Sequence, residues 1–130
     1  MRLEDVVFKH YPKSQLRLRH MLSAPEYDLD VWIKVPSKRF VKITVNTPPR
    51  LSPSTHGIHG LYEVSLYVDK PPEEALGILK PFSTLPGCMS VHEKGTNRFV
   101  LNCVVGEEDV EKFVEGYVRL VRNMVEEGIL

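Results

Sequence analysis

Residues 27–45 (YDLDVWIKVPSKRFVKITV) alternate between apolar and polar side chains. A period of two places alternate side chains on opposite faces of a strand, so this stretch predicts strands with one buried face. The turn at 36–38 (Pro-Ser-Lys) predicts that they form a β-hairpin over 27–45. Trp32 falls on the face opposite the apolar row, where it is either a contact residue or covered by a helix or by the N-terminal arm.

Residues 46–60 break the pattern with three prolines and two glycines, and predict a long crossing without regular structure. Long connections in compact domains are functional or mobile. After it, 61–69 reads as a strand, and residues 71–80 predict a helix with prolines and acids in its first turn.

A second hairpin is predicted over 88–105, turning around Gly95 and Thr96. In that register Cys88 faces Cys103, Val91 faces Val100 and Glu93 faces Arg98. We expect the two cysteines to be buried thiols, with a cross-strand disulfide as the alternative. Residues 106–130 then place their apolar side chains at helical spacing, which predicts a closing amphipathic helix.

The N-terminal residues 1–26 satisfy neither period well, and a helix that ends before Pro25 is expected there. These elements predict an α+β two-layer sandwich. It has a mostly antiparallel sheet of about five strands, with the two later helices on one face. The chain is expected to form a single domain over 1–130, in which 61–128 is a ferredoxin-like β-α-β-β-α unit.

Composition narrows the class of protein. The chain has 130 residues, of which 42% are hydrophobic and 26% charged, as in soluble globular proteins. No apolar segment approaches the roughly 20 residues that cross a bilayer. Glu4 and Asp5 stand where a signal peptide would carry basic residues. We therefore expect a cytoplasmic protein with no membrane partner.

Charge is balanced overall but uneven along the chain. Residues 1–50 hold ten Lys and Arg against five Asp and Glu, whereas residues 51–130 hold seven against twelve. This asymmetry indicates either a basic arm on an acidic body or opposite charges that face each other within one fold. The basic residues, with aromatic and histidine side chains among them, are candidates for RNA phosphate contacts: Lys9, Lys13, Arg17, Arg19, Lys38 and Arg39.

The stretch THGIHG at 55–60 carries the alternative, enzymatic interpretation. His56 and His59 are three residues apart, and a histidine can act as an acid or base near neutral pH. Zinc needs three or four ligands, and no second pair occurs at metal spacing, so no metal site is predicted. Glycine-rich phosphate loops and paired carboxylates are also absent, so no cofactor is predicted.

The order strand, helix, strand, strand, helix over 61–128 resembles the small dimerising subunit of KEOPS, the complex that makes threonylcarbamoyladenosine on transfer RNA. The residues that carry the resemblance are PPEEALGILKPF at 71–82 and EGYVRLVRNMVE at 115–126. The chain departs from the family pattern at Glu115 and Gly116, where the family usually has Asn-Ser. The resemblance implies a noncatalytic, dimeric subunit with a protein partner, and Tyr117 and Arg119 match the positions of the partner-binding motif.

Two hypotheses follow. The first is a non-enzymatic scaffold or binding subunit, a homodimer in an RNA-linked assembly. The second is a small enzyme or ligand-binding protein that uses His56 or His59 in the 46–60 crossing. A soluble α+β protein without a nucleic-acid role is the remaining alternative.

Overall fold

The computed structural model describes residues 3–23, 26–93 and 97–130. Its elements, in chain order, are α1 (Leu3–Phe8), η1 (Lys13–Gln15), β1 (Leu16–Ser23), β2 (Glu26–Ile33), β3 (Val41–Thr47), β4 (Leu61–Asp69), α2 (Glu73–Leu79), η2 (Lys80–Thr84), β5 (Cys88–Glu93), β6 (Arg98–Gly106), η3 (Glu107–Asp109) and α3 (Val110–Glu126), where η marks a 3-10 helix.

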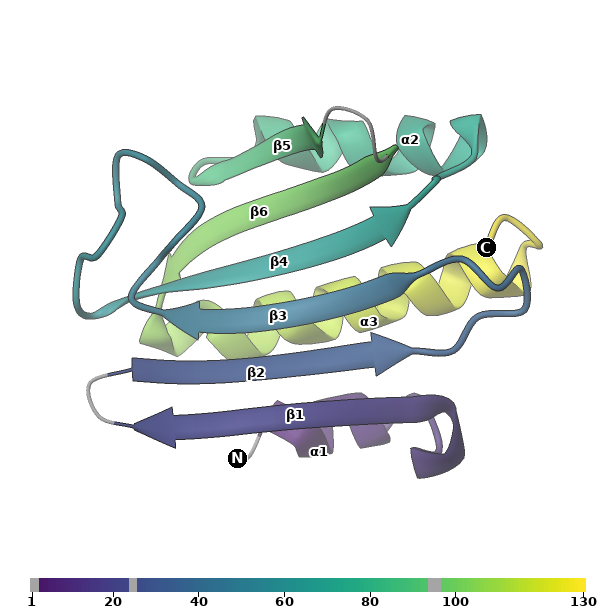
Figure 1. Cartoon of the computed structure of the whole chain (residues 1–130). Helices are drawn as coiled ribbons and strands as arrows, with labels where there is room; N and C mark the ends of the chain where they lie inside the picture. The colour runs from purple at the N-terminus through teal and green to yellow at the C-terminus, as the bar shows by residue number, and fades with distance from the viewer. Residues whose placement is uncertain (1–2, 24–25, 94–96) are drawn as a thin grey trace.

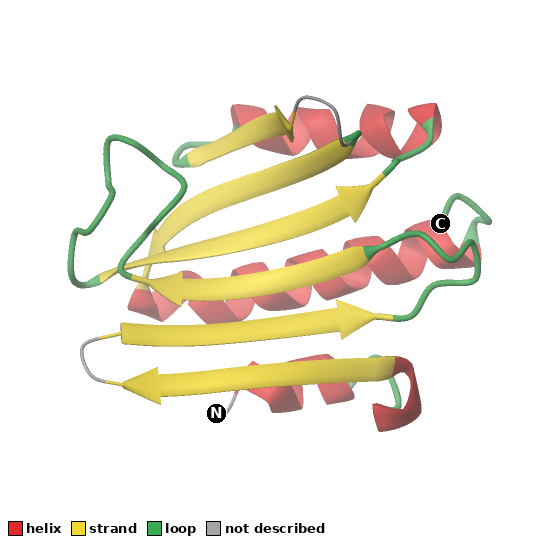
Figure 2. Ribbon diagram, in the orientation of Figure 1, coloured by secondary structure: helices red, strands yellow, loops and turns green. Residues whose placement is uncertain are grey.

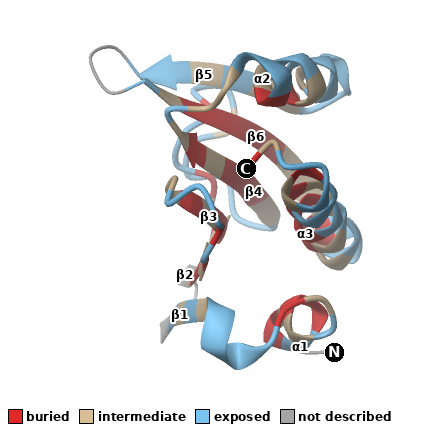
Figure 3. Cartoon of the chain, turned by 90° about the vertical axis from the view of Figure 1, so that its right-hand side faces the viewer, coloured by how far each residue is buried: buried red, intermediate tan, exposed pale blue. Residues whose placement is uncertain are grey.

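The strands form one antiparallel sheet in the order β1-β2-β3-β4-β6-β5 (Figure 1). Helices α1, α2 and α3 lie on the same face of this sheet, so none of the described α-helices covers the opposite face (Figure 3). The result is an α+β fold whose sheet has one covered face and one open face. Among the described residues, no helix is long and apolar enough to cross a membrane.

The core lies between the sheet and the helices. Alternate residues of the central strands point into it, as Val64, Leu66 and Val68 of β4 do, and each is fully buried. Helix α3 packs its own apolar stripe against them, which removes these side chains from water. The polar residues between them in sequence therefore point to the open face.

The predicted hairpins and later helices are confirmed. Strands β2 and β3 pair as expected over 27–45, and α2 and α3 occupy the predicted helical segments. The register predicted for the second hairpin is confirmed by the pairs Cys88–Cys103, Val91–Val100 and Glu93–Arg98. Its turn, predicted at Gly95 and Thr96, lies outside the described residues.

The prediction for the N-terminal segment was wrong. In place of a helix that ends before Pro25, the chain forms the short helix α1 and then strand β1, which pairs with β2 along its whole length. The sheet therefore has six strands rather than about five. The physical reason lies in LRLR at 16–19, where leucine and arginine alternate with the period of a strand.

Cys88 and Cys103 form a disulfide between β5 and β6. The expectation of two buried thiols was therefore wrong, and the alternative, a cross-strand disulfide, is what the structure contains. Cys103 is buried in the core, whereas Cys88 is half-buried on the edge strand.

The crossing between β3 and β4 folds back on itself and is pinned to β4 (Figure 2, left). The backbone N–H groups of Arg50, Leu51 and Ser52 donate to the carboxylate of Glu63 at 2.9–3.2 Å. Glu63 is completely buried by this arrangement. The hydroxyl of Thr47 donates to the carbonyl of Leu61 at 2.7 Å and closes the base of the crossing. The crossing is thus tied to the sheet by specific hydrogen bonds.

Candidate nucleic-acid interface

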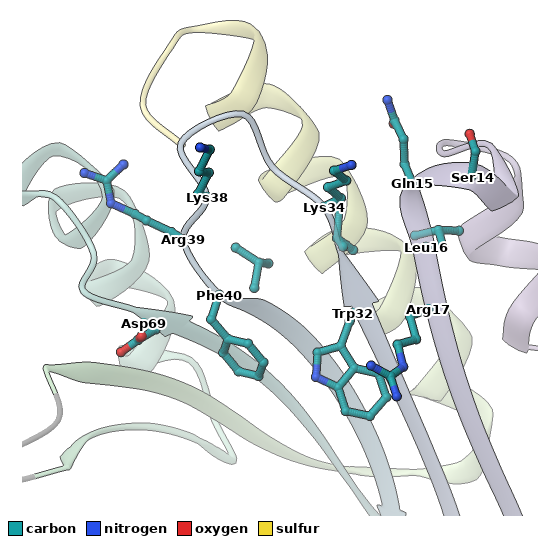
Figure 4. Close-up of a pocket in the computed structure, with 12 residues that line it drawn as sticks. Ser14, Gln15, Leu16, Arg17, Trp32, Lys34, Lys38, Arg39, Phe40 and Asp69 are labelled. Atoms are coloured by element: carbon teal, nitrogen blue, oxygen red, sulfur yellow. The ribbon is translucent and has the colours of Figure 1, made fainter.

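A hollow of about 500 Å³ lies where β1, β2 and β3 meet the β2–β3 loop, on the open side of the sheet. Figure 4 shows the rings of Trp32 and Phe40 on the same side of the sheet, with Arg17 beside Trp32. Four cationic side chains and one carboxylate line this hollow: Arg17, Lys34, Lys38, Arg39 and Asp69. We call this set, with the two rings, the basic-aromatic hollow.

Local sequence places each ring. Trp32 alternates with Val31 and Ile33, which are buried in the core, so the indole must point to the open face. Phe40 immediately precedes β3, and its carbonyl accepts a hydrogen bond from the backbone N–H of Asp69 at 2.9 Å. Both rings are half-buried. Each side chain therefore keeps part of its surface exposed to solvent.

The walls of the hollow are held by backbone hydrogen bonds. The N–H of Lys34 donates to the carbonyl of Gln15 at 2.9 Å, which joins the end of β2 to η1. The N–H of Lys38 donates to the carbonyl of Val35 at 3.1 Å and closes the turn. Lys38 has a φ of 61°, in the left-handed region, as a tight turn requires. These bonds fix the loop that carries Lys38 and Arg39.

The hollow continues along the sheet into a cluster centred on Lys42. The Lys42 ammonium lies 4.7 Å from the ring centroid of Tyr67 and 5.6 Å from those of Trp32 and Phe40. Burial lowers the pKa of Lys42, and the charge of Asp30 opposes that shift. Lys42 and the rings around it form a half-buried patch in which cations and aromatic faces alternate.

The cations of the hollow stand outside the salt bridges of the described residues. Among the described residues, no carboxylate lies within salt-bridge distance of Arg17, Lys34, Lys38 or Arg39. The other described arginines are paired, as in Arg50 with Asp28 at 2.9 Å. Four cations against the single Asp69 carboxylate leave the hollow with a net positive charge, which attracts an anionic ligand.

The structure brings together some of the predicted RNA contacts and separates others. Arg17, Lys38 and Arg39 line the hollow. Arg19 lies beside it, 5.9 Å from the Trp32 ring, with its Nε donating to Asp30 at 3.0 Å.

Lys9 and Lys13 lie toward the helices instead. The Lys13 ammonium lies over the ring of Phe8 in α1, at 5.2 Å. Lys9 lies close enough to Glu115 of α3 for its charge to affect that carboxyl. Desolvation raises the pKa of Glu115, but hydrogen bonds from Arg119 and His10 and the charge of Lys9 together lower it. These two lysines therefore do not line the hollow.

His56 and His59 are both exposed at the tip of the crossing and do not line the hollow. Within the described parts of the chain, no group of three or more His, Cys, Asp or Glu side chains is placed to hold a metal ion. Among the described residues, neither histidine forms a hydrogen bond or an ion pair with another side chain, and the enzymatic hypothesis stays a prediction.

Of the two positions that match the partner-binding motif, Tyr117 is only 4% exposed. Its hydroxyl donates to the carbonyl of Val64 at 3.0 Å and lies 3.1 Å from the sulfur of Cys103. Arg119 is exposed on α3 and pairs with Glu115 at 3.0 Å. Tyr117 thus holds α3 to the sheet, and Arg119 is the one of the two that a partner can reach.

Four residues at the site were not identified from the sequence: Lys34, Phe40, Lys42 and Tyr67. A signal was available for Lys42, because a hairpin centred on Ser37 places residue 42 opposite residue 32, and this pairing is observed. Tyr67 required the pairing of β3 with β4 across the long crossing, which no local pattern indicates.

Comparison of the chain with protein-family models, curated proteins and solved structures gives no significant match.

Proposed function

We propose that this protein binds a single-stranded nucleic acid on the open face of its sheet. The observation that carries the proposal is the basic-aromatic hollow, in which two half-exposed rings lie among four cations that lack carboxylate partners. Aromatic rings stack on bases of any sequence, and lysine and arginine neutralise the phosphates between them. A duplex buries its base faces, so only an unpaired strand can use both kinds of contact.

In this proposal Trp32 and Phe40 each accept a base, and Arg17, Lys38 and Arg39 contact phosphates. A hollow of about 500 Å³ lies within the roughly 300–1,000 Å³ range of small-ligand pockets, so it accepts one or two nucleotides rather than a long segment. The neighbouring patch around Lys42 continues the path of the strand toward β4.

We further propose that the protein acts as a noncatalytic subunit of an RNA-linked assembly. Two features support this role. The segment that resembles the KEOPS subunit has the expected order of elements, β4, α2, β5, β6 and α3. The candidate interface also offers binding groups and no residues that combine as an acid, a base and a nucleophile.

Fluorescence anisotropy of a labelled oligonucleotide tests the proposal. Each cation that contacts a phosphate contributes about −0.7 to the slope of log affinity against log salt concentration. Lys38→Ala should therefore flatten that slope by about 0.7. Trp32→Ala removes stacking, and should cost roughly 1–3 kcal/mol of binding with the salt slope unchanged.

Lys80→Ala is the matched control, because Lys80 is an exposed lysine on η2, outside the hollow. It should leave both the affinity and the salt slope at wild-type values. Parallel titrations with single-stranded RNA, single-stranded DNA and a duplex of the same sequence show which kind of nucleic acid the protein binds. Equal losses in the Lys38→Ala and Lys80→Ala variants would show that binding is diffuse attraction to surface charge, and would contradict the proposal.

A further inference from the structure

The Cys88–Cys103 disulfide lies near one edge of the sheet, and its two sulfur atoms differ in what can reach them. Cys88 belongs to β5, the strand at the end of the sheet, and is half-buried (Figure 1). Cys103 is 1% exposed on β6, and its neighbour across β4, Val64, is completely buried. A thiolate attacks a disulfide sulfur from the side opposite the sulfur that leaves. Attack on Cys88 therefore comes from beyond the edge strand, whereas attack on Cys103 would have to come through the core.

The buried sulfur has a hydrogen-bond donor beside it. The hydroxyl of Tyr117 lies 3.1 Å from the sulfur of Cys103 and 3.0 Å from the carbonyl oxygen of Val64, so it can donate to either. Burial raises the pKa of Tyr117, which keeps the proton on this hydroxyl at neutral pH. Hydrogen bonds to charged groups are stronger than those to neutral groups, so the hydroxyl stabilises negative charge on Cys103 when the disulfide breaks. This environment favours Cys103 as the sulfur that leaves.

Cys103 also borders free space. It is one of the residues that line a hollow of about 270 Å³ between η2 and α3, which we call the apolar hollow. Most of the lining is hydrophobic, with the side chains of Phe82, Leu85, Phe113 and Leu120 beside Gly116. Two separate thiols need more room than a bonded pair, because their sulfur atoms move apart to van der Waals contact. The apolar hollow offers that room on the side of Cys103, so the fold can hold the reduced pair.

We propose that this disulfide is a thiol-exchange site, at which Cys88 forms a mixed disulfide with an external cysteine thiol of the glutathione class. In the first step the external thiolate bonds to the sulfur of Cys88, the Cys88–Cys103 bond breaks, and its electron pair leaves on Cys103. In the second step another external thiolate bonds to the first external sulfur and releases Cys88. The protons that the two external thiols lose go to Cys88 and Cys103. The protein disulfide gains two electrons, and the two external thiols become one disulfide.

The rate at which reduced glutathione opens the disulfide, measured against urea concentration, tests the proposal. The rate is expressed relative to that of a small-molecule disulfide in the same solutions. Attack on the folded protein exposes no new surface, so this relative rate should stay constant below the unfolding transition. A disulfide that is reached only through unfolding would be reduced faster with each increment of urea, with the slope of global unfolding. That result would overturn the proposal.

Two single-cysteine variants test which sulfur takes the external thiol. Cys103→Ser leaves only Cys88, and Cys88→Ser leaves only Cys103, so oxidised glutathione can form a mixed disulfide at one position in each. Mass spectrometry of the intact protein follows the reaction without urea. We expect the mixed disulfide to form roughly tenfold faster or more at Cys88, because access limits the reaction at Cys103. Equal rates in the two variants would contradict the assignment of Cys88.

Tyr117→Phe tests the hydrogen bond to the leaving sulfur. It should slow the reduction of the folded protein by roughly tenfold, the value of a hydrogen bond to a charged group. A purely structural role predicts the opposite sign, because a less stable fold opens more often and is reduced faster. Tyr11→Phe is the matched control, since Tyr11 is also buried but does not line the apolar hollow, and it should keep the wild-type rate. A Tyr117→Phe rate at or above the wild-type rate would overturn the assignment of Cys103 as the leaving sulfur.

Discussion

Tyr117 shows how a residue at an expected interface position can instead support the fold. Its ring is buried between α3 and the sheet, and its hydroxyl donates to the backbone of β4. Loss of one buried hydrogen bond costs about 0.5–1.5 kcal/mol. The Tyr-aliphatic-Arg pattern therefore combines a core anchor with an exposed arginine, two roles that the sequence motif alone does not separate.

The same tyrosine predicts how stability depends on pH. Burial raises the pKa of Tyr117 well above its ordinary value of 10.0. Above pH 10 the unfolded chain gives up this proton while the folded chain keeps it. The free energy of unfolding should therefore fall as pH rises, by up to about 1.4 kcal/mol per pH unit from this group.

Tyr117→Phe removes that titration, so urea unfolding between pH 9 and pH 11 should show a shallower decline than in the wild type. A residual decline is expected, because burial also raises the pKa values of Tyr11, Tyr62 and Tyr67. Parallel declines in the variant and the wild type would contradict the account of Tyr117.

At the scale of elements, the crossing between β3 and β4 depends on one carboxylate. Glu63 accepts backbone hydrogen bonds from Arg50, Leu51 and Ser52. Glu63→Gln keeps the size of the side chain but replaces one acceptor oxygen with an amide donor that faces N–H groups. Leaving such buried groups unsatisfied costs about 1–3 kcal/mol, so the variant should unfold at a lower urea concentration.

Hydrogen exchange localises the effect of Glu63→Gln. The amides of Arg50, Leu51 and Ser52 should exchange faster in the variant, while those of β1 and β2 keep their protection. The exposed Glu74→Gln on α2 is the matched control and should change neither quantity. If the three amides exchange at the wild-type rate in Glu63→Gln, then the carboxylate does not hold the crossing.

The elements that could be predicted from the sequence are those whose pattern depends on residues close together in the chain. Alternation over 27–45, helical spacing in the last 25 residues and the register of the second hairpin all depend on neighbouring positions, and all three are confirmed. Strand β1 also alternates at LRLR, but its short apolar run gives a weak periodic signal, and pairing with β2 is what selects the strand. The local pattern therefore decides an element only where it is long.

The candidate site was only partly predictable for the same reason. Arg17, Lys38 and Arg39 stand out by charge, but the hollow that unites them forms through the pairing of β1 with β2 and of β3 with β4. Lys9 and Lys13 have the same charge and lie toward the helices. Charge along a sequence therefore predicts candidates, and only the sheet topology decides which of them share a surface.

At the scale of the whole molecule, the sheet separates two surfaces with different chemistry. Its open face carries the basic-aromatic hollow, and its helix layer carries the apolar hollow beside Gly116.

We propose that a nucleic-acid strand contacts the open face at Trp32. This residue is the only tryptophan in the chain, so its fluorescence reports directly from the hollow. The measurement is a titration of unlabelled single-stranded RNA into the wild-type protein, followed by tryptophan emission, with duplex RNA and polyglutamate as controls for base pairing and for charge alone. We expect saturable quenching by the single strand, with an affinity that falls steeply as salt rises, and little quenching by either control. Unchanged tryptophan emission at RNA concentrations that saturate binding by anisotropy would contradict it.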